Sequence, residues 1–139
     1  MVTEPTQADA PPGAAKILVA EDEVLLRLMV ADALRREGFQ VFEASDAGEA
    51  IAILEAVRVD VVVTDLHMRA TGDGMEVAKC VRARRPGVPV ILASAHPPPI
   101  DGTHAFDAFF VKPFPPEDIA SWIRHWAKTV PDDVGSSLE

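Results

Sequence analysis

The sequence of 139 residues contains a single cysteine, Cys80, and no tyrosine. One cysteine excludes a disulfide within the chain and any zinc site built from several cysteines. No uncharged apolar run approaches the roughly 20 residues that a bilayer-spanning helix needs, so we expect no membrane segment. The first residues, MVTEPTQADAPPG, lack the basic and apolar regions of a secretory signal. We therefore expect a cytoplasmic protein.

Basic residues are also scarce, with 13 Lys and Arg against 22 Asp and Glu and a net charge of −9. Nucleic-acid binding requires a basic face. The nearest candidate, formed by Arg82, Arg84 and Arg85, falls at a predicted helix end, where cations are favourable for the helix itself. The charge distribution therefore predicts no nucleic-acid partner. Hydrophobic residues make up 48% of the chain, which is typical of a globular domain with a core.

Two end segments lack hydrophobic periodicity. Residues 1–14, with three prolines, are predicted to be a flexible leader, and residues 130–139 a flexible tail. The domain is expected to span residues 15–129. Within it, short apolar runs alternate with helical patterns, and the runs lie at residues 17–20, 41–42, 59–63, 90–93 and 109–111. Uninterrupted apolar runs are typical of strands buried on both faces of a parallel sheet.

Local signals mark helices after these runs. Asp46 and Glu49 have the spacing of a capping pair, and Gly38 lies where glycine ends a helix. A stripe containing Trp122 and Trp126 is expected to pack the last helix onto the sheet. Helices are predicted at residues 24–37, 47–57, 74–85 and 115–129. Prolines 97–99 cannot lie inside a helix, so the helix after the fourth strand is expected to be short, irregular or missing.

Strand and helix alternation predicts an α/β fold, a doubly wound sheet of five parallel strands with helices on both faces. Ligands of such sheets bind at the carboxyl ends of the strands. Glu21 and Asp22 follow the first strand, and Asp65 ends the third. Three carboxylates at one edge repel one another unless a cation relieves them. Mg²⁺, which prefers oxygen ligands, is the expected cofactor.

The other strand ends carry groups that suit a phosphoryl group. Ser94 offers a hydroxyl donor and Lys112 a compact positive charge. A carboxylate placed between these groups and Mg²⁺ can attack phosphorus and hold it as an acyl phosphate. Asp65 is the expected nucleophile, because its strand would lie between the acidic strand and the strands that bear Ser94 and Lys112.

Four segments together resemble a bacterial response-regulator receiver domain. They are ILVAEDE at residues 17–23, TDLHM at 64–68, SA at 94–95 and FFVKPF at 109–114, and the similarity covers roughly residues 15–129. The resemblance implies a flavodoxin-like sheet with strand order 2-1-3-4-5. It implies a response regulator of a two-component or phosphorelay pathway. We expect a single-domain regulator, because the residues after Thr129 are too few to fold alone.

The resemblance also assigns roles. Asp65 would accept the phosphoryl group from a sensor histidine kinase or a histidine phosphotransfer protein, and Lys112 would bind the phosphoryl oxygens. Glu21, Asp22, Asp65 and the main-chain carbonyl of His67 would hold Mg²⁺. Ser94 and Phe109 stand at the switch positions, and the bond between Lys112 and Pro113 is commonly cis in the family. Activity beyond self-phosphorylation and self-dephosphorylation is not expected, so the protein is not expected to be an enzyme.

Two departures from the family pattern stand out. Glu21 replaces the more usual aspartate, and the segment from residue 96 to 107 is shortened, so that output to a downstream protein must be remodelled. One alternative is therefore a receiver-like binding module that works without phosphorylation. A second is a hydrolase that uses an aspartyl phosphate, as haloacid-dehalogenase-like phosphatases do. Those enzymes have an aspartate two residues after the nucleophile, where this sequence has His67. Surface or loop roles are expected for the side chains of His67 and His96.

Overall fold

The computed structural model describes residues 13–68, 74–96 and 106–129. The elements in these ranges are β1 (Lys16–Ala20), α1 (Val24–Arg36), β2 (Gln40–Ala44), α2 (Ala47–Ala56), β3 (Val61–Asp65), α3 (Gly74–Arg84), β4 (Val90–Ser94), β5 (Ala108–Val111) and α4 (Pro116–Thr129). The predicted alternation of strands and helices is confirmed.

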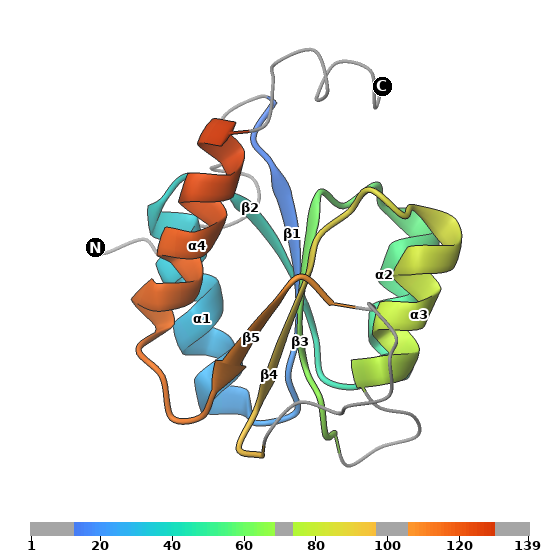
Figure 1. Cartoon of the computed structure of the whole chain (residues 1–139), viewed down its shortest axis with the longest axis horizontal. Helices are drawn as coiled ribbons and strands as arrows, with labels where there is room; N and C mark the ends of the chain where they lie inside the picture. The colour runs from blue at the N-terminus through green and yellow to red at the C-terminus, as the bar shows by residue number, and fades with distance from the viewer. Residues whose placement is uncertain (1–12, 69–73, 97–105, 130–139) are drawn as a thin grey trace, which may run out of the picture.

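All five strands form one parallel sheet in the predicted order, β2-β1-β3-β4-β5. Ala20 of β1 lies beside Thr64 of β3, and Asp65 lies beside Ala93 of β4. Because the strands run in the same direction, their carboxyl ends meet at one edge of the sheet (Figure 1). The residues that end or follow β1, β3, β4 and β5 are therefore brought to the same place.

Helices cover both faces of the sheet, with α1 and α4 on one side and α2 and α3 on the other (Figure 1). Neighbouring residues of β1 point to opposite faces. Ile17 packs into the cluster that contains Ile119 of α4, while Leu18 packs into the cluster that contains Val77 of α3. Burial on both faces explains why β1, β3 and β4 are largely apolar without alternation. Trp122 and Trp126 pack against the cluster on the α1 and α4 side, as predicted.

The capping signals of the sequence act as predicted. The side chain of Asp46 accepts a hydrogen bond from the Glu49 amide at 2.8 Å at the start of α2. Glu49 in turn accepts hydrogen bonds from the Ser45 amide at 2.6 Å and the Ser45 hydroxyl at 2.7 Å, which lower the pKa of Glu49. Gly38 follows α1 with φ of 94°, a conformation that favours glycine.

Element ends differ from the prediction by one or two residues. The largest difference is in β3, which begins at Val61 and not at Val59, and continues to Asp65. Val59 is buried, but it precedes the strand, whereas Asp60 ties the chain to β1 by accepting a hydrogen bond from the Lys16 amide at 2.8 Å. An apolar run reports burial, and burial alone does not separate a strand from the loop leading into it. α1, α2 and α3 each end one residue earlier than predicted, and α4 begins at Pro116 and not at Pro115.

Some predictions concern residues outside the described ranges. The prediction of an irregular segment after β4 falls mainly on residues 97–105, and those of a leader and a tail fall mainly on residues 1–12 and 130–139. Of the helices in the described part of the chain, none has the length and apolarity that crossing a membrane requires.

Candidate functional site

Three carboxylates gather at the carboxyl edge of the sheet. Glu21 and Asp22 follow β1, and Asp65 is the last residue of β3. One carboxylate oxygen from each lies within 4.8 Å of the others. Glu21 and Asp65 are both buried, with 5% of each residue exposed. Such a cluster of acids is unfavourable unless cations compensate its charge.

Lys112 supplies a compensating charge. Its Nζ donates a hydrogen bond to Glu21 Oε1 at 3.0 Å and lies 3.2 Å from Asp65 Oδ2. Lys112 directly follows β5, and its amide donates to the carbonyl of Ser94 at 2.8 Å, so the end of β4 fixes its backbone. The bond between Lys112 and Pro113 is cis, as the resemblance implied. Lys112 therefore contacts Asp65 and Glu21 at once.

Burial and charge act together on the protonation of this cluster. Burial raises the pKa of Glu21 to about 7 and the negative charge of Asp65 adds to the increase, while hydrogen bonds from the Glu23 amide and Lys112 oppose it. Burial also acts to lower the pKa of Lys112, but its hydrogen bond to Glu21 and the charges of Glu21 and Asp65 outweigh that effect and raise the pKa. Lys112 is consequently held in its charged form, and Glu21 titrates near neutral pH.

Backbone contacts hold Asp65 in place. The Leu66 amide donates to the carbonyl of Ala93 at 2.8 Å, and the His67 amide approaches Asp65 Oδ1 at 3.4 Å. On the other side, Gly74 begins α3 so close to β3 that a Cβ built on it would overlap the Asp65 carbonyl. Gly74 was not predicted from the sequence to be part of the site, although a glycine at a helix start is a signal for a close backbone approach.

The donor set suits a hard divalent cation. Oxygens bound to one Mg²⁺ ion lie roughly 3–4 Å apart, because each bond is about 2.1 Å long. The oxygens of Glu21, Asp22 and Asp65 lie within 4.8 Å of one another, so small side-chain rotations or bridging water would let them share one ion. His67, whose carbonyl the resemblance adds to the ligands, lies at the same edge through its amide contact with Asp65.

The family model that matches this chain is that of the response regulator receiver domain, and it covers residues 17–124. The chain belongs to this family. Among curated proteins, the probable transcriptional regulatory protein TcrX of Mycobacterium tuberculosis is 37% identical over 112 residues, which are 78% of this chain and 47% of that protein. This receiver domain spans about half the length of the curated relatives it matches.

Solved structures of receiver proteins share the fold. A response regulator receiver protein from Sinorhizobium medicae is 29% identical with a TM-score of 0.75, and the match covers 84% of this chain and 96% of that one. The response regulator TrrA from Thermotoga maritima, in complex with Mg²⁺-BeF, is 26% identical with a TM-score of 0.72 over 80% of this chain and 97% of that one. The predicted family and fold are therefore confirmed.

The two switch candidates of the receiver domain lie on adjacent strands. Ser94 is buried at the end of β4, one residue after the register partner of Asp65. Its Oγ accepts a hydrogen bond from the His96 amide at 3.1 Å, and a hydroxyl that accepts can still donate its proton. Phe109 of β5 is half-buried, packs on the α2 and α3 side, and its ring lies 6.0 Å from that of Phe106. Their switch roles stay predictions.

Two exposed histidines next to the site residues pair with each other, which was not predicted from the sequence. The rings of His67 and His96 lie 5.9 Å apart in an edge-to-face arrangement, and both residues are exposed. Each follows a site residue by two positions, His67 after Asp65 and His96 after Ser94. The pairing of β3 with β4 brings them together, and their distance along the chain gave no sign of it.

Proposed function

We propose that Asp65 of this receiver domain accepts a phosphoryl group from the phosphohistidine of a sensor histidine kinase or a histidine phosphotransfer protein, in a reaction that depends on Mg²⁺. The observation that supports the proposal best is the position of Lys112 Nζ, 3.2 Å from Asp65 Oδ2 and 3.0 Å from Glu21 Oε1. The groups proposed as nucleophile, as the cation for the phosphoryl oxygens and as further acidic ligands therefore lie at one edge of the sheet.

In the proposed reaction, a carboxylate oxygen of Asp65 attacks phosphorus. The O–P bond forms as the P–N bond of phosphohistidine breaks, and the imidazole nitrogen keeps the electron pair and takes a proton from solvent. The Lys112 ammonium and the Ser94 hydroxyl would donate hydrogen bonds to the phosphoryl oxygens. When bound, Mg²⁺ would supply further neutralisation of the phosphoryl charge. Hydrolysis of the acyl phosphate would then restore Asp65.

Two lines support the metal requirement. The three carboxylates provide only oxygen ligands, which is the preference of Mg²⁺. TrrA, whose fold this chain shares, has been solved in complex with Mg²⁺-BeF. The residues proposed to hold Mg²⁺ are Glu21, Asp22, Asp65 and, through its carbonyl, His67.

The proposal also covers how the signal leaves the domain. The phosphorylated domain would contact a downstream protein, or it would serve as a sink for phosphoryl groups. It would do so in the cytoplasm and without activity on other substrates.

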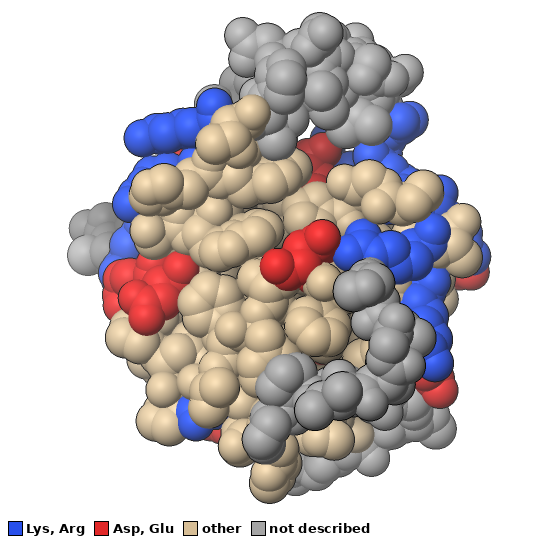
Figure 2. Space-filling view, in the orientation of Figure 1, with Lys and Arg blue, Asp and Glu red and all other residues tan. Residues whose placement is uncertain are grey.

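The proposal includes no nucleic-acid contact by this domain. Figure 2 shows Lys and Arg side chains along the side that carries α3. Arg82 there pairs with Asp107 at 2.6 Å and Arg84 with Glu55 at 3.0 Å. Basic residues with acidic partners offer less charge to phosphates, which supports this part of the proposal.

Incubation with phosphoramidate, a small donor whose P–N bond mimics phosphohistidine, tests the proposal. We expect one phosphoryl group per chain by intact mass in the presence of Mg²⁺, and none for Asp65→Asn. Asp32→Asn is the matched control, because Asp32 lies on α1 in an exposed pair with Arg36. Equal labelling of all three proteins would contradict the role of Asp65. If the wild type were labelled neither by phosphoramidate nor by a histidine kinase, the result would favour the binding module that works without phosphorylation.

A further inference from the structure

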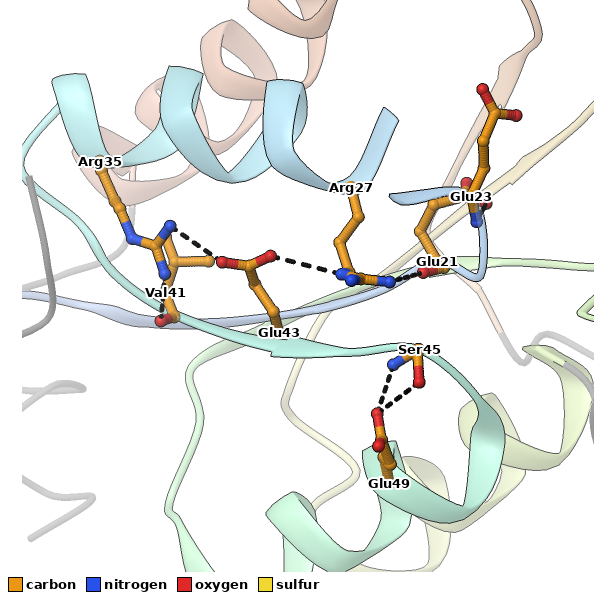
Figure 3. Close-up of polar contacts among 8 residues, drawn as sticks. All are labelled: Glu21, Glu23, Arg27, Arg35, Val41, Glu43, Ser45 and Glu49. Carbon is orange, nitrogen blue, oxygen red and sulfur yellow. Dashed lines mark hydrogen bonds and ion pairs between the residues drawn. The ribbon is translucent and has the colours of Figure 1, made fainter. Parts of the chain in front are cut away.

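Arg27, in the first turn of α1, contacts the loop after β1 that carries Glu21 and Asp22. Arg27 Nη1 donates a hydrogen bond to the main-chain carbonyl of Glu21 at 2.8 Å. Its Nε donates to Glu43 Oε1 of β2 at 3.3 Å. Figure 3 shows the guanidinium between these two acceptors. One planar group therefore ties the loop after β1 to the neighbouring strand.

Glu43 is itself fixed from its other side. Arg35 Nη1 donates to Glu43 Oε2 at 3.0 Å, and Arg35 Nη2 donates to the carbonyl of Val41 at 3.2 Å (Figure 3). The Arg27 and Arg35 side chains are similarly shielded, with 16% and 17% exposed. Because Glu43 is held between two guanidinium groups, it gives Arg27 a fixed acceptor on β2.

The loop before α1 is held by contacts of Glu21. Glu23 occupies the N-cap position, but its side chain makes no capping hydrogen bond, and its amide donates instead to Glu21 Oε2 at 3.0 Å. The Glu21 amide donates to the carbonyl of Ala44 at 2.9 Å. β2 therefore holds the amide of Glu21 directly, and it holds the carbonyl of Glu21 through Arg27.

We propose that Arg27 is a positioning residue for the metal site: by fixing the peptide between Glu21 and Asp22, it aims both carboxylates at the cation shared with Asp65. The inference rests on the proposed function, because it concerns the same Mg²⁺ site. Groups that hydrogen-bond to metal-binding residues set the orientation of those residues, and their loss typically weakens metal binding by about tenfold or more.

The charge of Arg27 makes the inference easy to separate from simple electrostatics. A cation next to a cation-binding site opposes Mg²⁺ by Coulomb repulsion. Removing that charge would by itself tighten Mg²⁺ binding, whereas loss of positioning would weaken it. The two effects change the Mg²⁺ affinity in opposite directions, so the direction of the measured change in affinity identifies the effect that dominates.

Mg²⁺ titration of the full chain, followed by amide chemical shifts, tests the inference. We expect Arg27→Met to raise the Mg²⁺ dissociation constant about tenfold. Arg35→Met removes the other guanidinium from Glu43 and leaves the Glu21 contact in place, so its dissociation constant should stay within about twofold of wild type. Arg27→Lys keeps the charge and one donor site, and it should recover part of the affinity.

Phosphorylation by phosphoramidate provides a second readout. Arg27→Met should need more Mg²⁺ for half-maximal rate but reach nearly the wild-type rate at saturating Mg²⁺, a split that a general loss of stability would not produce. Unchanged or tighter Mg²⁺ binding by Arg27→Met, or equal weakening by Arg35→Met, would overturn the inference. If the wild type itself bound no Mg²⁺, the proposed metal site would fail instead, so the two failures are distinguishable.

Discussion

At the scale of single residues, the proposed function depends on how one lysine and three acids are arranged at the carboxyl edge of the sheet. Lys112 contacts Glu21 and Asp65 together, and the structure places Asp22 within reach of both acids. Any change in protonation or charge there alters the whole cluster, because each group is a neighbour of the others.

Replacement of Lys112 should affect the stability of the fold and the rate of phosphoryl transfer in ways that Mg²⁺ can distinguish. Lys112→Met leaves the acids without their ammonium, and because the lysine is partly exposed we expect a loss of about 1–2 kcal/mol in the free energy of unfolding. Added Mg²⁺ should recover part of that loss, whereas phosphoryl transfer should stay slow at saturating Mg²⁺. Urea unfolding with and without Mg²⁺ measures the first effect, with Lys128→Met on the exposed side of α4 as the control. A Lys112→Met protein that is phosphorylated at the wild-type rate would contradict the role given to this residue.

Mg²⁺ binding should depend on pH through Glu21. Its pKa is raised to about 7, and a metal ligand must be deprotonated, so below that pH the affinity should fall by up to about tenfold per pH unit. In Glu21→Gln the affinity should be weaker and nearly constant between about pH 6 and pH 8. Mg²⁺ titrations at several pH values provide the test, and a wild-type affinity that does not vary over this range would argue against it.

The same group has a predictable effect on stability without Mg²⁺. Burial raises the folded-state pKa of Glu21 above its ordinary value of 4.5, so between 4.5 and about 7 the folded state binds more protons than the unfolded state. The contribution of Glu21 is therefore fully present below pH 4.5 and is lost as the pH rises through about 7. Urea unfolding should show that the free energy of unfolding declines as the pH rises across this range, and that the decline is smaller in Glu21→Gln. An equal dependence of the free energy of unfolding on pH in both proteins would contradict the prediction.

At the scale of elements, helix starts determine how the strand ends are held. Before α1 the carbonyl of Glu21 accepts a hydrogen bond from Arg27, at α2 the side chain of Asp46 caps the helix, and at α3 Gly74 lies against β3. The Asp46 cap was visible in the sequence because cap and partner lie three residues apart. The contacts of Arg27 and Gly74 cross to other strands or loops, so local pattern alone did not reveal them.

Gly74→Ala tests the approach of α3 to β3. The added Cβ would overlap the Asp65 carbonyl, so either α3 or the acceptor must shift. We expect a loss of about 1–3 kcal/mol in the free energy of unfolding, together with slower phosphorylation. Gly87→Ala is the control, because a Cβ added there would meet no atom within 4 Å beyond the adjacent residues, so this change should be nearly neutral. Equal stabilities of the two variants would show that the contact tolerates a side chain.

At the scale of the whole molecule, the order of the strands turns four separate segments into one edge. Uninterrupted apolar runs and short links were enough to predict the α/β class, and the resemblance to receiver domains provided the strand order. The residues at strand ends could be predicted because parallel strands bring their carboxyl ends together. The pairing of His67 with His96 could not be predicted, because it depends on the paths of two loops after β3 and β4.

Location of the phosphoryl group after transfer from a phosphohistidine protein tests the central claim most directly. Borohydride reduces an acyl phosphate to the alcohol, so a phosphorylated aspartate is converted to homoserine and can be identified by peptide sequencing. We predict homoserine at position 65, formed only when Mg²⁺ was present during the transfer. Homoserine at another aspartate, or a phosphoryl group retained on His67 or His96 with Asp65 unmodified, would contradict the account.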